Sequence, residues 1–382
     1  MTVTFEYQQT RRFFAQVPDG MEALAAEEIS ELGAKGIRTA YRGVHFEAEL
    51  NTLYRVNYSA RCLARILAPL LSFRCHTYEV LYRRARQVEW SRIFTPRHSF
   101  AVVANVSNSS LRHSRYAALS LKDAIVDHFR ERLKARPDVE RSEPDLRINL
   151  HIEGNRATLS LDTSGESLHR RGYREEALEA AMQETLAAAV IRLTRWDGST
   201  PFYDPMCGSG TLLAEALMQY CRIPAGFLRK HFGFRFLPDH DENLWHKVRQ
   251  EENRRRRELP EGLISGSDIS QQAADLTRAN LRRLPHGERV EIRTIDFRKL
   301  TGLQNTTIVC DPPYGIRTYR NEDLGDLYKA LGDFLKQRCR GSVAFIYFGN
   351  RKLISKVGLK TSWKVPLTAG GLDGRLAKYE LY

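Results

Sequence analysis

Four aspartates in the second half of the sequence each follow a short apolar run: Asp204 after PFY, Asp268 after LISGS, Asp296 after VEIRTI and Asp311 after TTIVC. Runs of this kind are typical of parallel strands buried on both faces of a sheet. In an open parallel sheet, ligands bind in the crevice outside the carboxyl ends of the strands. One aspartate at such a place is usually a turn residue or a helix N-cap. Because four occur in the same position, we expect their carboxylates to line one cleft.

The first of these aspartates opens a glycine-containing loop, which reads DPMCGSGT and leads into the helical pattern LLAEALMQY. Gly208 and Gly210 lack side chains, so backbone can approach a ligand closely at the start of this helix. The loop is not a dinucleotide fingerprint, because Leu213 occupies the third glycine position, and it is not a P-loop, because no lysine follows the glycines. An adenosyl amino acid fits it better than a phosphate-bearing cofactor.

The next two strand ends complete a site for such a ligand. The glycine turn can accept the amino-acid end, and Asp268 can hold both ribose hydroxyls. Asp296 can accept a hydrogen bond from the adenine amine, with Ile269 and Phe297 on either side of the ring.

The fourth strand ends in Asp311-Pro312-Pro313-Tyr314, a sequence suited to methylating an exocyclic amine. Such an amine is a weak nucleophile, and acceptors around its N–H groups localise the lone pair and stabilise the charge that develops on nitrogen. The Asp311 carboxylate and the Pro312 carbonyl are two such acceptors. The prolines hold that carbonyl rigidly, and Tyr314 offers a face for a base. DPPY alone would indicate only a turn; beside the glycine loop it predicts a reaction centre.

The elements that position these residues form a doubly wound α/β domain. The predicted strands are PFYD, LISGSD, VEIRTID, TTIVCD and SVAFIYF, separated by helical segments, and WKVPLTAGGLDGRLAKYELY is expected to be a terminal hairpin. Residues 221–262, which include FGFRF, Trp245 and the run Arg254 to Arg257, are too long for a plain connection. They predict an insertion with its own helix. Its four arginines suit either a solvated helix face or contact with a nucleic-acid strand.

Two smaller α+β units precede this domain. The first is expected to contain strands at 12–18 and 43–50 and helices at 21–33 and 50–71, the latter ending near Pro69. The second is expected to contain a strand at 100–107, a helix at 116–135 and a hairpin of 146–154 with 156–165 that turns at Gly154-Asn155. The main boundary falls between residues 165 and 180, in a charged linker, 167–183, whose later part is expected to be helical.

Positive charge is concentrated in residues 60–136, which span the end of the first unit and most of the second. The whole chain carries 59 Lys and Arg against 46 Asp and Glu, a net charge of +13, and residues 60–136 hold fifteen basic against five acidic residues. A polyanion is the natural partner of such a segment, although a solvated surface is the simpler alternative. The interleaved aromatics could stack bases, but we expect most of them to be core. They are Tyr82, Trp90, Phe94 and Tyr116.

Composition excludes several other classes of protein. Hydrophobic residues make up 42% and charged residues 27% of the chain, which is typical of folded globular domains and not of disorder. No eighteen-residue stretch is free of charge and the first residues lack a signal-peptide core, so we expect a cytoplasmic protein without membrane association. Six cysteines without CxxC spacing fit reduced thiols and predict no metal.

With these residues assembled, the chain resembles the class I S-adenosylmethionine-dependent RNA methyltransferases that carry a THUMP domain. It is most similar to the N-terminal, N2-guanosine-methylating half of the bacterial large-subunit ribosomal RNA methyltransferases. The resemblance covers nearly the whole chain. Its motifs are RGVHF from Arg42, LKDAIVDHF from Leu121, LHRRGYR from Leu168, ETLAAAV from Glu184, DPMCGSGTLL from Asp204, GSDIS from Gly266 and DPPYGIR from Asp311.

The resemblance implies an α/β fold with a ferredoxin-like domain over residues 1–70, a THUMP RNA-binding domain over 71–165 and a Rossmann-like methyltransferase domain over 166–382. It implies S-adenosylmethionine as the cofactor. The chain departs from some relatives in one respect, because no second catalytic domain is expected after the terminal hairpin. The target amine would meet Asp311, Pro312, Pro313 and Tyr314. The implied cofactor contacts are Glu184, Thr185, Asp204, Met206, Cys207, Gly208, Gly210, Asp268, Ile269, Asp296 and Phe297.

Substrate and activity retain alternatives. The ribosomal subgroup more often reads NPPYGER, whereas DPPYGIR is similar to transfer-RNA N2-guanosine enzymes, so ribosomal RNA is favoured and transfer RNA is the alternative. An adenine-N6 DNA methyltransferase would use the same acceptor geometry, and the basic amino-terminal domains argue against it. A non-catalytic RNA-binding protein is a third interpretation. The presence of every cofactor and acceptor position argues against loss of activity.

Overall fold

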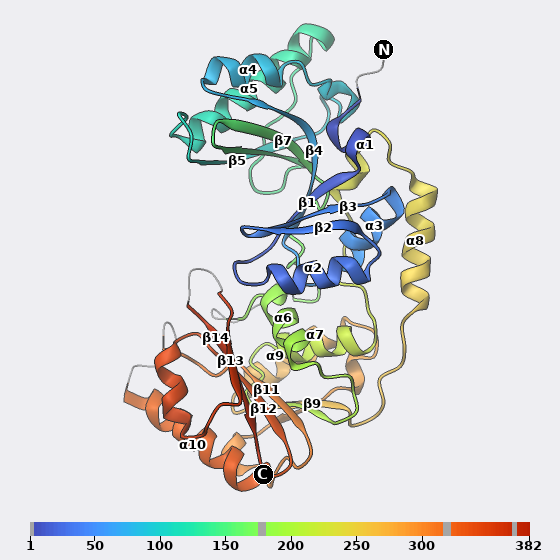
Figure 1. Ribbon diagram of the computed structural model, residues 1–382. Coiled ribbons are helices and arrows are strands. Elements are labelled where there is room, and N and C mark those ends of the chain that lie inside the picture. The colour runs from blue at the N-terminus through green and yellow to red at the C-terminus, as the bar shows by residue number, and fades with distance from the viewer. Residues whose placement is uncertain (1–3, 175–180, 316–321, 369–372) are drawn as a thin grey trace.

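The structure is a computed structural model of the 382-residue chain and describes residues 4–174, 181–315, 322–368 and 373–382. It has an amino-terminal half and a carboxy-terminal half, each built on a seven-stranded sheet (Figure 1). Within the described ranges, none of the helices combines the length and the apolar character needed to cross a membrane.

The amino-terminal sheet joins the two predicted α+β units into one body. Its strand order is β2-β3-β1-β4-β7-β6-β5, with β4 paired to β7 at the junction of the units. The strands are β1 (Arg12–Gln16), β2 (Lys35–Ala40), β3 (Gly43–Glu47), β4 (Arg65–Arg74), β5 (Phe100–Ser107), β6 (Leu146–Glu153) and β7 (Arg156–Asp162). The helices are α1 (Glu6–Thr10), α2 (Glu22–Glu31), α3 (Leu50–Ser59), α4 (Tyr78–Ala85) and α5 (Ser114–Leu133).

One predicted element of this half is wrong. The helix expected over residues 50–71 ends at Ser59, and residues 65–74 form strand β4. The leucine- and alanine-rich composition of this segment suits a helix, but its pairing with β1 and β7 decides its structure. Pro69, which lacks an N–H, lies where the register with β7 shifts, a position at which a sheet tolerates proline. The β6–β7 hairpin is confirmed, with positive φ at both Gly154 and Asn155.

The carboxy-terminal sheet confirms the predicted α/β domain. Its order is β10-β9-β8-β11-β12-β14-β13, parallel from β10 to β12, and the terminal hairpin adds the antiparallel strands β14 and β13. The order reverses beside β8, because β9 lies on one side of it and β11 on the other. The strands are β8 (Phe202–Asp204), β9 (Ile264–Asp268), β10 (Glu291–Thr294), β11 (Thr307–Cys310), β12 (Val343–Phe348), β13 (Trp363–Pro366) and β14 (Arg375–Glu380).

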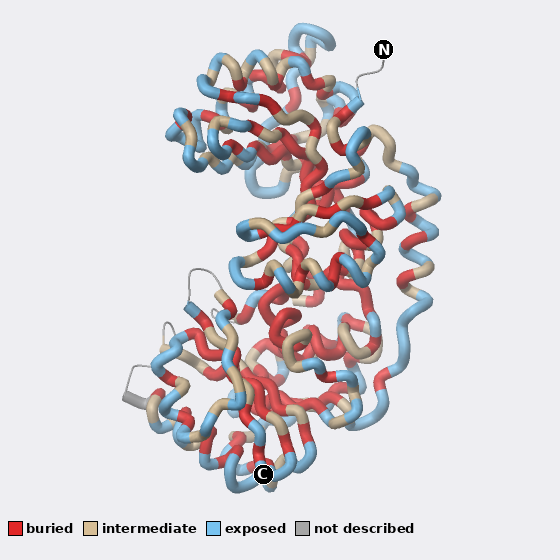
Figure 2. Tube along the Cα trace, viewed as in Figure 1, coloured by how far each residue is buried: buried red, intermediate tan, exposed pale blue. Residues whose placement is uncertain are grey.

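Helices cover both faces of this sheet. Helices α6 (Glu184–Thr194), α7 (Thr211–Tyr220) and α9 (Gln271–Arg282) share one apolar core with the amino-terminal half, and α10 (Glu322–Arg338) packs in a second core with β11 and β12. Figure 2 shows buried residues concentrated along the central strands. Strand β10 departs from the expected burial on both faces, because it is the exposed edge of the sheet.

The predicted insertion contains helix α8 (Glu242–Arg254), which runs alongside the amino-terminal half and packs on α3 (Figure 1). The contact is polar at its centre: Glu252 accepts hydrogen bonds of 3.0 Å from both Arg55 Nε and Ser59 Oγ. Tyr58 donates through its hydroxyl to Asn253 Oδ1 at 3.0 Å. The insertion therefore fixes the amino-terminal half to the α/β domain.

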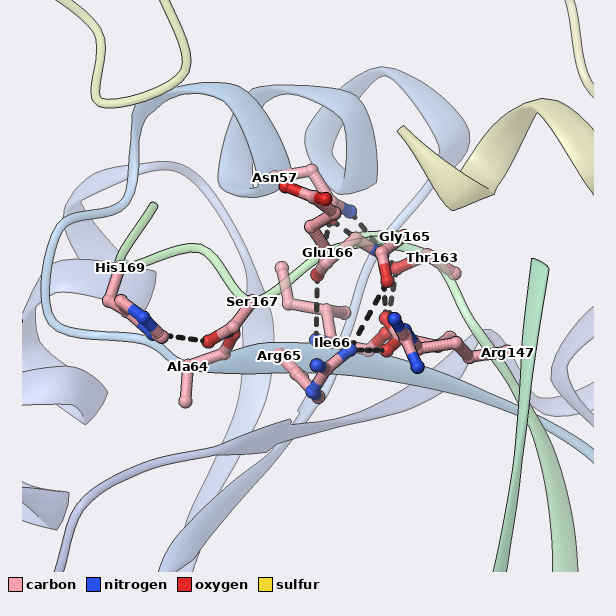
Figure 3. Close-up of polar contacts among 12 residues, drawn as sticks. Asn57, Ala64, Arg65, Ile66, Arg147, Thr163, Gly165, Glu166, Ser167 and His169 are labelled. Carbon is pink, nitrogen blue, oxygen red and sulfur yellow. Dashed lines mark hydrogen bonds and ion pairs between the residues drawn. The ribbon is translucent and has the colours of Figure 1, made fainter. Parts of the chain in front are cut away.

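The linker that follows β7 is fastened to β4 (Figure 3). The Thr163 amide donates to the Ile66 carbonyl at 2.8 Å, and the Ser167 hydroxyl donates to the Ala64 carbonyl at 3.2 Å. The helix expected in the later part of 167–183 falls on residues 175–180, which lie outside the described residues. Up to Arg174 the linker is extended and irregular, and polar contacts hold it.

Candidate active site

The register of the parallel strands brings the four predicted aspartates to one edge of the sheet. On β9, Gly266 pairs with Asp204 and lies two residues before Asp268. On β10, Thr294 pairs with Asp268 and lies two residues before Asp296. Asp311 directly follows β11, the strand on the other side of β8. The edge at β8 and β11 is the point where the strand order reverses, which is where open α/β sheets bind ligands.

The glycine loop after β8 is hydrogen-bonded to the end of β9. The amide of Gly208 donates to Asp268 Oδ2 at 2.9 Å, and Asp268 Oδ1 accepts from the Ser270 amide at 2.9 Å. Gly208 has φ +55°, and a Cβ there would point into open space with no atom within 4 Å. Gly210 has φ +80°, and a Cβ there would lie 2.7 Å from Thr277 Cγ2. The loop is thus open at its first glycine and closely packed at its second.

Two residues that the sequence analysis did not identify hold this loop from helix α9. The Thr277 hydroxyl donates to the Gly208 carbonyl at 2.8 Å, and the Asn280 side-chain amide donates to the Ser209 carbonyl at 3.0 Å. Both side chains are buried. Polar residues three apart on the buried face of an amphipathic helix were the signal that could have found them.

Asp204, Met206 and Cys207 shape the loop from inside. Asp204 is 1% exposed, and its Oδ1 accepts from the Met206 amide at 3.0 Å. Burial, together with the negative charges of Asp268 and Asp311, raises the pKa of Asp204 well above its ordinary value. Cys207 is buried, and its amide donates to the Ser267 carbonyl at 2.9 Å. The polar groups of these residues bond mainly within the loop and to β9, so their main role is to set the conformation of the loop.

Glu184 and Thr185 begin helix α6 and are buried beside the start of α7. Arg174, the last residue described before the gap at 175–180, connects the two helices: its guanidinium donates to Thr211 Oγ1 at 2.6 Å and lies 3.7 Å from Glu184 Oε1. Burial raises the pKa of Glu184, and the positive charge of Arg174 opposes that rise. The sequence analysis treated Arg174 only as part of the LHRRGYR motif.

The predicted adenine-binding residues lie less directly in the site. The Asp296 carboxylate pairs with Arg298, at 3.0 Å from Nε to Oδ1 and 2.6 Å from Nη2 to Oδ2, and hydrogen bonding to Arg298 lowers its pKa. Ile269 is 62% exposed, next to Asp268. Phe297 is buried edge-on against Phe334, with ring centroids 5.7 Å apart. Ile269 is therefore accessible in this structure, whereas Phe297 belongs to the core.

Asp311 has the most unusual environment of the four aspartates. Its Oδ1 is buried and has no hydrogen-bond partner among the described residues. Burial raises the pKa of Asp311 to about 8. The neighbouring Pro312 carbonyl accepts from the buried Tyr328 hydroxyl at 3.4 Å. An acceptor kept without a partner is costly unless a ligand supplies the missing donor.

Tyr314 packs on the backbone of Gly349, after strand β12. A Cβ at Gly349 would lie 2.7 Å from the Tyr314 ring, so only glycine leaves room for the tyrosine as it is placed. Pro313 and Tyr314 are half-buried. Ile316 and Arg317 of the DPPYGIR motif lie outside the described residues.

The basic segment of the amino-terminal half lies partly on its surface. Trp90 and Phe94 are buried, as expected for core residues, whereas Tyr116 is 61% exposed. The exposed arginines of this segment include Arg83, Arg92, Arg97, Arg112 and Arg115. Positive charge is thus available to a partner in solution.

The residues at the strand ends fit an adenosyl amino acid. Gly208, whose backbone is open, follows β8, and Asp311, whose Oδ1 has no partner among the described residues, follows the neighbouring strand β11. Between them the site offers an acceptor for an N–H group and a close approach for a ligand at the start of α7. The groups that the site offers to a ligand are carboxylate oxygens and backbone amides.

Comparison with known protein families gives three successive matches. Residues 12–67 match the RlmL ferredoxin-like domain, residues 75–162 match the THUMP domain, and residues 171–378 match the RMKL-like methyltransferase domain. These three segments correspond to the first part of the amino-terminal sheet, its second part, and the α/β domain.

Individual relatives align along nearly the whole chain. The Synechocystis sp. protein named "Putative RNA methyltransferase slr0064" is 38% identical over 98% of this chain and 97% of its own length. The Ribosomal RNA large subunit methyltransferase K/L of Syntrophotalea carbinolica is 35% identical over 97% of this chain and 53% of its own length. The chain therefore spans about half the length of that relative.

A solved structure agrees with both halves of the fold. The crystal structure of SMU.472, described as "a putative methyltransferase complexed with SAH", superposes with a TM-score of 0.86 at 27% identity and covers 100% of this chain and 99% of that one.

Proposed function

The chain belongs to the family of the RMKL-like methyltransferase domain, and we propose that it transfers the methyl group of S-adenosylmethionine to the exocyclic N2 amine of a guanosine in structured RNA. Large-subunit ribosomal RNA is the substrate that its relatives favour, since the K/L proteins it matches are named for it. The relative bound to SAH supports the cofactor. Six buried, unpaired cysteines fit a reducing compartment, the cytoplasm.

The observation that carries the proposal is the orphaned oxygen of Asp311 beside the glycine loop. A buried carboxylate oxygen that has no donor among the described residues is what an amine-methylating site needs, because the amine brings the missing N–H. The position of Asp311 at the end of β11, next to β8, places this acceptor at the reversal of the strand order.

Each residue of the DPPY segment has a part in activating the amine. Asp311 accepts one N–H and stabilises the positive charge that develops on the nitrogen. The Pro312 carbonyl, which the two proline rings hold in place, accepts the second N–H through its remaining lone pair. Tyr314, backed by Gly349, offers its ring to the base, so that positioning contributes much of the rate.

The glycine loop and the neighbouring strand ends hold the cofactor, which supplies a methyl group bonded to a positively charged sulfur. Gly208 and Gly210 bring backbone to its amino-acid end, where Glu184 and Thr185 lie behind the start of α7. Asp268 accepts from its ribose hydroxyls while it also holds the Gly208 amide. Ile269 covers one face of the adenine. Asp296 meets the adenine amine only when its pairing with Arg298 is rearranged.

The amino-terminal half presents the RNA. We assign residues 1–70 and 71–165 to docking structured RNA and residues 166–382 to catalysis, in line with the ferredoxin-like and THUMP matches. Exposed arginines in 60–136 supply the contacts with phosphate groups, so binding should weaken steeply as salt rises.

The test is transfer of labelled methyl groups by the purified full-length chain to large-subunit ribosomal RNA, to transfer RNA and to duplex DNA. The proposal predicts labelled N2-methylguanosine in ribosomal RNA and no label in duplex DNA. Labelled N6-methyladenine in DNA would establish the alternative amine methyltransferase. Label confined to transfer RNA would keep the reaction and change the substrate.

A further inference from the structure

Residues 164–170, which follow β7 and lead into the linker between the two halves, are held by hydrogen bonds from β4 and from the insertion. Arg229, in the insertion, donates to four of their backbone carbonyls at 2.9 to 3.1 Å. The carbonyls belong to Ser164, Glu166, Ser167 and Arg170. The path of the linker as far as residue 170 is therefore fixed relative to the insertion and to β4.

The next contact joins the linker to helix α7. Arg171 forms an ion pair with Glu215, at 3.2 Å from Nε to Oε1, and the two side chains are 1% and 0% exposed. The remaining nitrogens of Arg171 donate to the carbonyls of Leu168, at 2.6 Å, and Arg61, at 2.5 Å. A buried pair of this kind is stable only with such additional hydrogen bonds, so it fixes the place of the linker on α7.

Arg174 makes a second contact with the same helix, one turn nearer its start. Thr211 and Glu215 are four residues apart on α7 and lie on one face. Arg174 Nη2 donates to Thr211 Oγ1 at 2.6 Å and to the Met182 carbonyl at 3.0 Å, while Nη1 lies 3.7 Å from Glu184 Oε1. One guanidinium thus connects the residue after the glycine loop with the first residue of α6.

Glu184 needs this positive charge nearby. The charged and titratable groups that face it are Arg174, Arg171, Tyr173 and Glu215. Burial raises the pKa of Glu184 and Glu215 adds to the rise, whereas the two arginines oppose it, Arg174 most. Arg171 is already paired with Glu215, so Arg174 is the cation that most opposes the rise in the pKa of Glu184.

We infer that Arg174 is a positioning residue for cofactor binding: it holds Thr211 and Glu184 in the arrangement that receives the amino-acid end of S-adenosylmethionine. The inference rests on the proposed function and goes beyond it, because it assigns to the linker motif LHRRGYR a role in the cofactor site. Through this contact, the segment that fastens the RNA-binding half also sets the geometry of the glycine loop.

The experiment is calorimetry of the full-length chain with S-adenosylhomocysteine as the probe. Arg174→Gln removes the charge and the two-pronged contact, and it should weaken binding about 10-fold to 100-fold, the range for hydrogen bonds to charged groups. Arg170→Gln is the matched control, because its side chain is 64% exposed and, among the described residues, it pairs with Glu166 alone, at 3.7 Å. It should bind the probe within about twofold of wild type.

Kinetics and pH separate positioning from a general structural defect. In Arg174→Gln, KM for S-adenosylmethionine should rise while kcat at saturating cofactor and KM for RNA stay within about twofold. Relative to wild type, its affinity for S-adenosylhomocysteine should fall further as pH is lowered, because Glu184 loses the cation that opposes the rise in its pKa. Arg174→Lys should restore most of the pH behaviour but only part of the affinity.

A double substitution tests whether Arg174 acts on cofactor binding through Thr211. Thr211→Val removes the acceptor on α7, and its effect should not add to that of Arg174→Gln, because both remove the same contact. Full additivity would show that Arg174 does not act through Thr211 and would overturn that part of the inference.

Two further outcomes would contradict the inference and differ in what else they affect. If wild type binds S-adenosylhomocysteine and Arg174→Gln binds it equally well, Arg174 has no part in the cofactor site, and the proposed function stands. If wild type itself does not bind the probe, the proposed function fails and the inference fails with it.

Discussion

The backbone amide of Gly208 donates a hydrogen bond of 2.9 Å to Asp268 Oδ2, which joins the glycine loop after β8 to the carboxyl end of β9. One acid thus supports the loop at the edge of the sheet where the strand order reverses. Since Asp268 Oδ1 also accepts from the Ser270 amide, its side chain is held from both sides of the strand end. The cofactor site that we propose is therefore formed jointly by the ends of two neighbouring strands, β8 and β9.

Asp268→Ala should weaken binding of S-adenosylhomocysteine by about 1 to 3 kcal/mol, because the Gly208 amide loses its acceptor and the ribose hydroxyls lose theirs. Calorimetry measures the loss. Asp275→Ala is the control, since Asp275 lies on the surface of α9 and its partners within the described part of the chain are two neighbouring side chains, Gln271 and Arg278. Unchanged affinity in a folded Asp268→Ala protein would remove this residue from the cofactor site.

Asp311→Asn should act on the reaction and leave cofactor binding nearly intact. We expect kcat to fall about 100-fold or more, since the amide offers a weaker, neutral acceptor to the developing charge. In wild type, the pKa of about 8 means that kcat/KM rises with pH up to about 8 and then levels off. A flat profile between pH 6 and 9 would show that ionisation of Asp311 does not limit the reaction.

Although Asp311→Asn should lower activity, it should raise the stability of the folded protein. The folded protein keeps the Asp311 proton up to pH 8, whereas the unfolded chain loses it near pH 4, so this group lowers stability progressively between those values. Asp311→Asn should therefore be more stable than wild type at pH 8, with a difference that shrinks toward pH 4. Urea denaturation at both pH values measures the difference, and an equal effect at both would contradict the burial of this carboxylate.

Glu252→Ala should loosen the insertion from the amino-terminal half. Glu252 is 6% exposed and accepts from Arg55 and Ser59, so its removal takes away the shorter of the two ion pairs of Arg55 and should cost about 2 to 4 kcal/mol. Trp245, buried in the same contact, reports the change by fluorescence during urea denaturation. Glu251→Ala, an exposed neighbour that also reaches Arg55, should cost less than about 1 kcal/mol. Equal effects of the two substitutions would argue against this role.

Tyr314→Ala tests how the base reaches Asp311. A guanine amine inside a helix is blocked by pairing and stacking, and extruding the base costs a few kcal/mol, least in loops and mismatches. If the Tyr314 ring receives the extruded base, the substitution should slow methylation of a paired target more than of the same nucleotide in an open loop. Single-turnover rates on two matched RNA substrates measure the difference. Equal slowing would limit Tyr314 to orienting a base that is already exposed.

The sequence predicts the α/β domain well because its strands are short apolar runs with an aspartate after four of them. It fails where local pattern and tertiary pairing disagree. Residues 65–74 have a helical composition but pair between β1 and β7. Strand β2 (Lys35–Ala40) was missed because it is an edge strand, mostly exposed and without apolar alternation.

The candidate site shows the same limit. The strand-end aspartates are predictable from position, whereas Thr277, Asn280 and Arg174 support the site from elements distant in sequence. The Arg298 guanidinium pairs with the Asp296 carboxylate. The sequence did not show that this pairing would compete with the hydrogen bond proposed between Asp296 and adenine. In the insertion, Arg256 and Arg257 lie over the rings of Phe227 and Tyr220, which neither interpretation of the arginine run anticipated.

The central claim is N2-methylation of a guanosine, and mass spectrometry of ribosomal RNA tests it most directly. Large-subunit RNA from cells with and without this protein is digested, and N2-methylguanosine is mapped to its position. The account predicts one modified guanosine that disappears without the protein, returns with wild type and does not return with Asp311→Asn. The account would be contradicted if N2-methylguanosine were the same in both cell lines while N6-methyladenine was lost from the DNA of the cells without the protein.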